Sequence, residues 1–141
     1  MTPIPLLDHR KQLTAHGKDL LRLCEIDFAT MMDTQRQPCG AFLFGMTYAY
    51  GKAQRLKPSD VHALIIGVLV DVLHYTTEQA TAFSFKLVHA TSGGPKNTLK
   101  AIIHRGIEGH RQLTAGDQAA LRQSLSAIFE TSKEPQVVQS N

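Results

Sequence analysis

The fold is decided by residues 61–73, which read VHALIIGVLVDVL. Apolar residues such as Val61, Leu64 and Val68 recur there at helical spacing, and others fill the flanks, as in a helix buried on nearly every side. Pro58 precedes the run and suits the first turn of a helix, because its missing N–H needs no partner there. The competing interpretation is a buried strand, since Ile and Val dominate and the glycine within the run would mark a bulge. The length of the run and its start signal favour a helix, which we expect to be the central one.

Two helices are expected before this run, because apolar residues recur there at helical spacing. The first is predicted over Asp8–Asp33 and the second over Cys39–Arg55, with a break at Gln35–Pro38 between them. Glycine lowers helix propensity by about 1 kcal/mol relative to Ala, so three glycines weaken the second helix unless they serve to let a neighbouring helix pack closely. These glycines are Gly40, Gly45 and Gly51.

Local start and stop signals predict two helices directly after the run. Thr76 and Gln79 form a capping box, in which each side chain bonds the backbone N–H of the other residue. The helix that follows is expected to stop at residues 92–95, which read SGGP, because Gly closes helices and Pro cannot continue them. Asn97 or Thr98 would cap the fifth helix.

A sixth helix is predicted to open at Thr114, with Asp117 three residues later. Apolar periodicity gives the expected buried faces of the last three helices. These faces comprise Ala80, Phe83, Leu87 and Val88; then Leu99, Ile102, Ile103, Gly106, Ile107 and His110; and finally Leu121, Leu125, Ile128 and Phe129. The sequence therefore predicts an all-α single compact domain of five to six helices over residues 1–131, followed by a flexible tail at 132–141. The composition agrees, since 141 residues with 43% hydrophobic and 19% charged content suit one globular domain.

No catalytic, cofactor or metal signature accompanies this fold. The seven histidines lack the short ligand spacings of zinc sites. Cys24 and Cys39 stand apart without a CxxC pair, so we expect buried free thiols. Neither a phosphate-binding glycine loop nor the serine motif of hydrolases occurs. We therefore expect no enzyme activity, no cofactor and no metal.

The sequence favours a cytoplasmic protein. The most apolar run, residues 61–73, is interrupted by His62 and Asp71 and is shorter than the roughly 20 residues that cross a bilayer. Residues 1–8 lack the basic start, long apolar run and small-residue cleavage site of a signal peptide. We therefore expect neither a membrane partner nor secretion.

The formal charge of +3 is concentrated in one segment. Residues 96–122 hold five basic and two acidic residues, an excess equal to that of the whole chain. On the fifth helix, the face opposite the apolar stripe is a candidate surface for an acidic partner. Its residues are Lys100, His104, Arg105, Glu108 and Arg111, with Tyr48 or Tyr50 as further candidates. The alternatives are a solvated face and, for His104 with Arg105, a salt-bridge network that holds helices together.

A helix-turn-helix is a second interpretation of the basic segment. The fourth helix, the turn at 92–96 and the fifth helix would bring Lys96, Asn97 and Lys100 to a major groove. The turn is longer than the usual three or four residues, and the positive charge is modest for phosphate contacts. Nucleic-acid binding is therefore disfavoured.

Three segments between Lys57 and Gly109 resemble a known family. They read KPSDV at 57–61, TTEQA at 76–80 and NTLKAIIHRGIEG at 97–109. This pattern resembles the small all-helical immunity proteins encoded beside bacterial polymorphic toxins, including toxins delivered by type VI secretion. The resemblance implies a non-catalytic protein that binds one cognate toxin effector and blocks its active site or its assembly.

The basic charge adds a constraint to that expectation. An inhibitor that mimics nucleic acid would be acidic, so this protein would have to occlude a nuclease in another way, or its toxin belongs to another class. The alternative function is a helical regulator or adaptor that acts through DNA or another protein. A homodimer is compatible with that alternative.

Overall fold

The computed structural model describes residues 5–23, 33–93 and 97–133, and every regular element in these ranges is an α-helix. The helices are α1 (Leu6–Leu23), α2 (Asp33–Ala53), α3 (Pro58–Leu73), α4 (Thr77–Thr91), α5 (Thr98–Thr114) and α6 (Gln118–Lys133). The predicted all-α class is confirmed. The second part of the predicted first helix, residues 24–32, and most of the predicted tail lie outside the described residues.

The apolar run forms a helix, as predicted, and the strand alternative is wrong. Pro58 occupies the first turn of α3, and His74 ends the helix in a left-handed conformation with φ of 59°. Gly67 does not mark a bulge: a methyl group there would lie 2.7 Å from the Arg10 Nε atom. Arg10 of α1 crosses at this point to form a two-pronged ion pair with Asp71, with Nε–Oδ2 and Nη2–Oδ1 distances of 2.8 Å.

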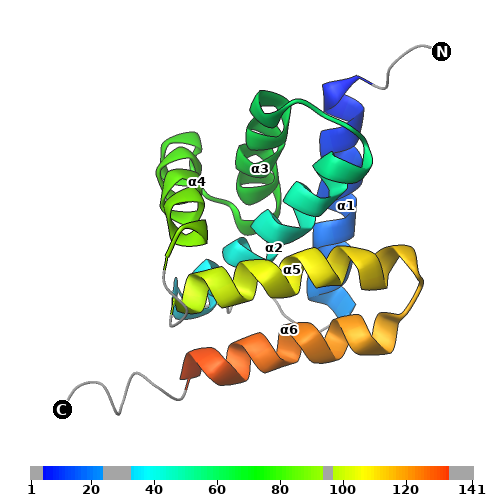
Figure 1. Ribbon diagram of the computed structural model, residues 1–141, viewed down its shortest axis with the longest axis vertical. Coiled ribbons are helices and arrows are strands. Elements are labelled where there is room, and N and C mark those ends of the chain that lie inside the picture. The colour runs from blue at the N-terminus through cyan, green and yellow to red at the C-terminus, as the bar shows by residue number, and fades with distance from the viewer. Residues whose placement is uncertain (1–4, 24–32, 94–96, 134–141) are drawn as a thin grey trace.

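The helix at the centre is α2 rather than α3. It packs against α3, α4, α5 and α6, whereas α3 packs against α1, α2 and α4. Figure 1 shows α2 passing behind α5, with α3 and α4 on one side and α6 on the other. Every residue from 38 to 47 is buried. Periodicity identifies α3 correctly as a buried helix, but small residues that admit neighbours on all sides place α2 in the middle.

The predicted break at Gln35–Pro38 is wrong, because α2 begins at Asp33 and continues through Pro38. A proline inside a helix costs about 3 kcal/mol relative to Ala. Pro38 lies in the second turn of α2, where it forfeits one backbone hydrogen bond, and it opens the buried stretch 38–47. Burial of the large side chains in that stretch contributes about 1.5–3 kcal/mol each, which outweighs the cost of the proline.

Close packing of α2 against α5 depends on glycine, as the sequence suggested. A methyl group at Gly45 would lie 2.0 Å from the Ile103 carbonyl oxygen, and one at Gly106 would lie 2.1 Å from the Phe42 carbonyl oxygen. Ordinary contacts of a Cβ atom begin near 3.4 Å. The two backbones therefore touch directly at this crossing.

Two of the predicted helix starts are confirmed. Thr76 and Gln79 form the capping box, with a bond of 3.1 Å from the Gln79 N–H to the Thr76 hydroxyl and one of 3.0 Å in return. The Asn97 side chain caps α5 by accepting a hydrogen bond of 3.0 Å from the Lys100 N–H. These motifs operate within four residues, so sequence alone predicts them.

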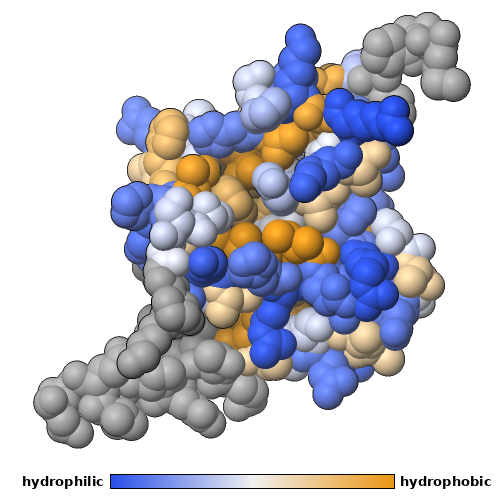
Figure 2. All heavy atoms as spheres, in the orientation of Figure 1, coloured by the Kyte–Doolittle hydropathy of each residue, from blue (hydrophilic) through white to orange (hydrophobic). Residues whose placement is uncertain are grey.

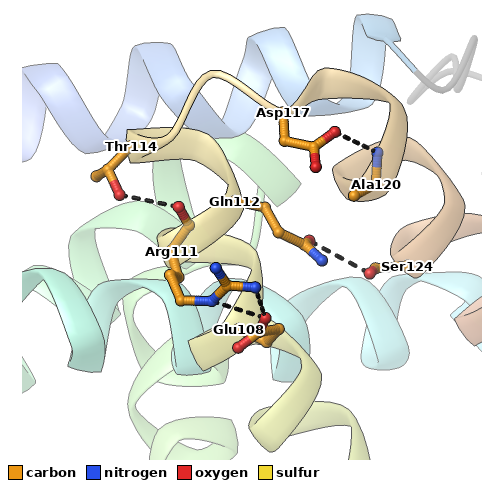
Figure 3. Close-up of polar contacts among 7 residues, drawn as sticks. All are labelled: Glu108, Arg111, Gln112, Thr114, Asp117, Ala120 and Ser124. Carbon is orange, nitrogen blue, oxygen red and sulfur yellow. Dashed lines mark hydrogen bonds and ion pairs between the residues drawn. The ribbon is translucent and has the colours of Figure 1, made fainter.

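The predicted start of the sixth helix at Thr114 is wrong. Thr114 ends α5, and its hydroxyl donates to the Arg111 carbonyl oxygen at 2.9 Å. Asp117 caps α6 instead, because its carboxylate accepts a hydrogen bond of 3.1 Å from the Ala120 N–H (Figure 3). Of the two polar residues that the sequence offers as a start for this helix, Asp117 is the cap and Thr114 is not.

Candidate functional site

An apolar groove of about 650 Å³ opens where α2, α3, α4 and α5 meet. Its apolar lining includes Phe44, Val61, Ile65, Val88, Ile103 and Ile107. Figure 2 shows apolar side chains exposed in this part of the surface, with hydrophilic atoms around them. The volume lies in the range of ligand-binding pockets. The groove is therefore a candidate binding surface.

Two lysines stand at the groove, and neither is neutralised by a carboxylate within the described part of the chain. The Lys52 ammonium lies over the Tyr48 ring, 5.8 Å from its centroid. The Lys100 ammonium donates a hydrogen bond of 3.1 Å to the Gly93 carbonyl oxygen. A ring face and a carbonyl oxygen hold these ammonium groups in position without cancelling their charge.

A histidine and a serine meet at the edge of the groove. His62 Nε2 lies 2.8 Å from Ser84 Oγ, and the His62 ring packs edge-on against Phe85. The Ser84 hydroxyl donates to the Thr81 carbonyl oxygen at 2.7 Å and is completely buried. A nucleophilic serine gives its proton to the histidine and faces the substrate. The pair therefore joins α3 to α4 and lacks the arrangement that nucleophilic catalysis needs.

The structure divides the predicted partner-binding residues into two groups. Lys100 and His104 line the apolar groove. Glu108 and Arg111 lie further along α5, where Arg111 Nε donates to Glu108 Oε1 at 2.8 Å and lowers the pKa of that carboxyl group (Figure 3). Arg105 is exposed. The predicted face is thus continuous with the groove at its Lys100 end only.

The intramolecular alternative for two of these residues finds no support. Among the described residues, no ion pair joins His104 or Arg105 to an acidic group. Both side chains are exposed on α5. Neither therefore links helices through a salt bridge in this part of the chain.

The two candidate tyrosines have different environments. Tyr48 is 42% exposed and lines the groove. Tyr50 is buried, and its hydroxyl lies 2.6 Å from His9 Nδ1 and 3.3 Å from Gln12 Oε1, both on α1. Burial raises the pKa of Tyr50. Of the two, only Tyr48 is accessible to a partner.

Sequence reasoning missed most of the groove, because its lining comes from four helices. Val88 was predicted to point inward, but it is 46% exposed and lines the groove. Its neighbours Phe83 and Leu87 are buried as predicted. Periodicity assigned Val88 to the apolar side of α4, and only the tertiary arrangement leaves that flank uncovered.

The described ranges contain neither a cluster of metal ligands nor a membrane-spanning helix. No group of three or more His, Cys, Asp or Glu residues there could hold a metal ion. No helix in those ranges combines the length and apolarity needed to cross a membrane. Cys39 is buried, as predicted, whereas Cys24 lies outside the described residues.

The helix-turn-helix alternative assigns DNA contact to Lys96, Asn97 and Lys100. Lys96 lies outside the described residues. The side-chain oxygen of Asn97 is occupied by the cap of α5, and Lys100 is bonded to the Gly93 carbonyl oxygen. Two of the three residues assigned to DNA contact therefore already have intramolecular hydrogen bonds.

Comparison with known proteins identifies the family. A family model described as immunity protein 48 matches residues 10–133, which include nearly all of the described helices. The chain belongs to the immunity protein 48 family. The match confirms the resemblance seen at residues 57–109 and extends it to α1, α2 and α6. No curated protein and no solved structure matches the chain.

Membership in the immunity protein 48 family gives the groove a functional context. Immunity protein families are generally non-catalytic, and membership implies a toxin as the partner. The apolar groove exposes Tyr48 and Val88, and the neighbouring α5 exposes the charged residues Arg105 and Arg111.

Proposed function

We propose that this member of the immunity protein 48 family binds a cognate toxin effector in the bacterial cytoplasm and neutralises it without catalysis. The observation that carries the proposal is the family match over residues 10–133. The proposal includes a toxin delivered by a polymorphic toxin system such as type VI secretion.

The outer face of α5 is the proposed toxin contact. It consists of Lys100, His104, Arg105, Glu108 and Arg111. All of these residues are exposed except the half-buried Lys100. Arg105 offers an unpaired guanidinium group among the described residues, and arginine is enriched among the residues that dominate binding energy. The face therefore suits an acidic surface on the toxin.

Cysteine chemistry and charge support the cellular setting and the mode of inhibition. The chain has two cysteines and no CxxC pair, so it lacks the disulfide framework that is common in secreted domains. The formal charge of +3 argues against mimicry of nucleic acid. We therefore propose that the protein covers a functional surface of a toxin that acts in the cytoplasm.

Coexpression with the product of the adjacent toxin gene tests the function. We expect the wild-type protein to restore growth to bacteria that express the toxin. We also expect it to elute with an inactivated toxin as a 1:1 complex in size-exclusion chromatography with light scattering. Absence of both growth rescue and a complex would reject the proposed function.

A charge-reversal variant tests the face separately. Lys100→Glu combined with Arg111→Glu should weaken toxin binding at least about tenfold, because like charges across an interface are strongly unfavourable. The matched control is Lys11→Glu combined with Lys18→Glu, which makes the same change in net charge at exposed positions of α1. Full binding by the α5 variant would reject this face while leaving the toxin-binding function intact.

A further inference from the structure

The apolar groove combines a core-like lining with open access to solvent. Among the described residues, the large hydrophobic side chains that remain exposed are Leu6, Leu7, Tyr48, Phe85 and Val88. Tyr48 and Val88 line the groove, and Phe85 packs on the groove residue His62. Exposed apolar side chains that gather at one place mark an interaction surface.

The groove is also one-sided in charge. Its lining includes Lys52, Lys100, His62 and His104, and it includes no Asp or Glu within the described ranges. The two lysine ammonium groups are fixed by the Tyr48 ring and by the Gly93 carbonyl oxygen. Because they are already held in place, a carboxylate that arrives between α2 and α5 meets positive charge at little entropic cost.

We infer that the apolar groove receives a segment of the toxin whose apolar side chains enter the groove and whose flanking carboxylates pair with Lys52 and Lys100. This inference rests on the proposed function and specifies the chemistry of the partner. A volume of about 650 Å³ accommodates a few apolar side chains. The charge at the groove then orients the segment, and the apolar contacts supply most of the affinity.

A second copy of this chain is a poorer occupant than an acidic segment. In a symmetric dimer the same patch meets itself, so two grooves face to face would bring the lysines of both copies together. Like charges opposed across an interface are strongly unfavourable. The charge of the groove therefore favours a partner of opposite sign.

Two variants separate the apolar and the ionic parts of the groove. Val88→Asp places a carboxylate on the apolar lining at an exposed position, and we expect it to reduce affinity for the inactivated toxin at least about 30-fold. Lys52→Glu combined with Lys100→Glu should reduce affinity at least about tenfold at low salt, with a smaller effect at high salt because ions screen exposed charges. Calorimetric titration measures both.

Matched controls show whether each effect belongs to the groove. Leu7→Asp adds a carboxylate at an exposed apolar residue of α1, and Lys11→Glu with Lys18→Glu repeats the double charge reversal there. Both should bind the toxin like the wild-type protein. Circular dichroism and urea unfolding should show native helix content for all four variants, because every substituted residue is exposed or half-buried.

A photoreactive benzophenone side chain in place of Val88 identifies the occupant directly. Crosslinking to the toxin, followed by peptide mass spectrometry, should give a segment with apolar residues flanked by Asp or Glu.

Crosslinking to a neutral or basic segment overturns the inference. So does wild-type affinity in both groove variants. Conversion of a dimeric wild-type protein into a monomer by Val88→Asp also overturns it, since the occupant is then a second copy. Failure of the wild-type protein to bind the toxin rejects the proposed function instead. That result differs from wild-type affinity in both groove variants, which rejects only the groove as the binding site.

Discussion

Replacement of Gly106 by alanine tests the contact that positions α2 against α5. The added methyl group would lie 2.1 Å from the Phe42 carbonyl oxygen, about 1.3 Å short of an ordinary contact at 3.4 Å. The obstacle is backbone, so no change of rotamer relieves it and the helices have to separate. A gap of 0.5–1 Å already forfeits a quarter to a half of the dispersion energy of each contact.

The expected loss of stability follows from two opposed contributions. Alanine gains about 1 kcal/mol over glycine in helix propensity. Overpacking costs about 1–3 kcal/mol, occasionally more, and separation additionally loosens the contacts of the fully buried Phe42. Because the obstacle is backbone, we take the upper end of the overpacking range; subtracting the propensity gain leaves a net destabilisation of about 2 kcal/mol, a large fraction of the 5–15 kcal/mol that stabilises a typical domain.

Urea unfolding followed by circular dichroism measures this change. Ala101→Gly is the matched control, because Ala101 is exposed on the same helix and reports the propensity difference alone, about 1 kcal/mol. Gly45→Ala combined with Gly106→Ala should cost less than the sum of the two single changes, since one separation relieves both clashes. A Gly106→Ala protein as stable as the wild type would refute the direct backbone contact.

Three further predictions concern the ends of the helices and the α1–α3 ion pair. Hydrogen bonds from the Arg10 guanidinium hold the pKa of Asp71 below its ordinary value of 3.8, so the stabilisation is present above that pH and is lost as the pH falls through the folded-state pKa. Urea unfolding between pH 2 and 6 should therefore show a weaker acid-induced loss of stability in Asp71→Asn than in the wild type, and equal pH dependence would contradict the pairing. Asp117→Ala should cost about 1 kcal/mol through loss of the α6 cap, whereas Thr114→Ala should cost clearly less; the reverse order in thermal melts would restore Thr114 as the helix start. Thr76→Ala should cost about 1 kcal/mol by the same measurement, and an unchanged melting temperature would show that the capping box contributes nothing.

Features that depend on a few consecutive residues could be predicted from the sequence. The Thr76 capping box and the Asn97 cap are satisfied within three residues, so no tertiary contact is needed to form them. The buried stripe of α5 follows likewise from its period, with Ile102 and Ile103 each 3% exposed. Local propensity and global packing agree at these positions.

Features that depend on the neighbours of a helix could not be predicted. Pro38 looks like a break until the burial of the following residues is known. Val88 looks like core until the uncovered flank of α4 is known. The groove gives only a fragmentary signal in the sequence: Tyr48 with Lys52 is spaced four apart on one helix, and Lys100 with His104 is spaced four apart on another. Nothing in the chain indicates that these pairs meet.

The contact between α2 and α5 at Gly45 and Gly106 limits which parts of the groove can vary. Phe44, Ile103 and Ile107 line the groove from α2 and α5, the two helices whose backbones touch at Gly45. Helices in such contact cannot slide or approach further, so this side of the groove is a fixed frame. The other side, on α3 and α4, includes the exposed side chain of Val88. Substitutions there can alter the apolar part of the groove while the frame, which carries Lys52 and Lys100, keeps its shape.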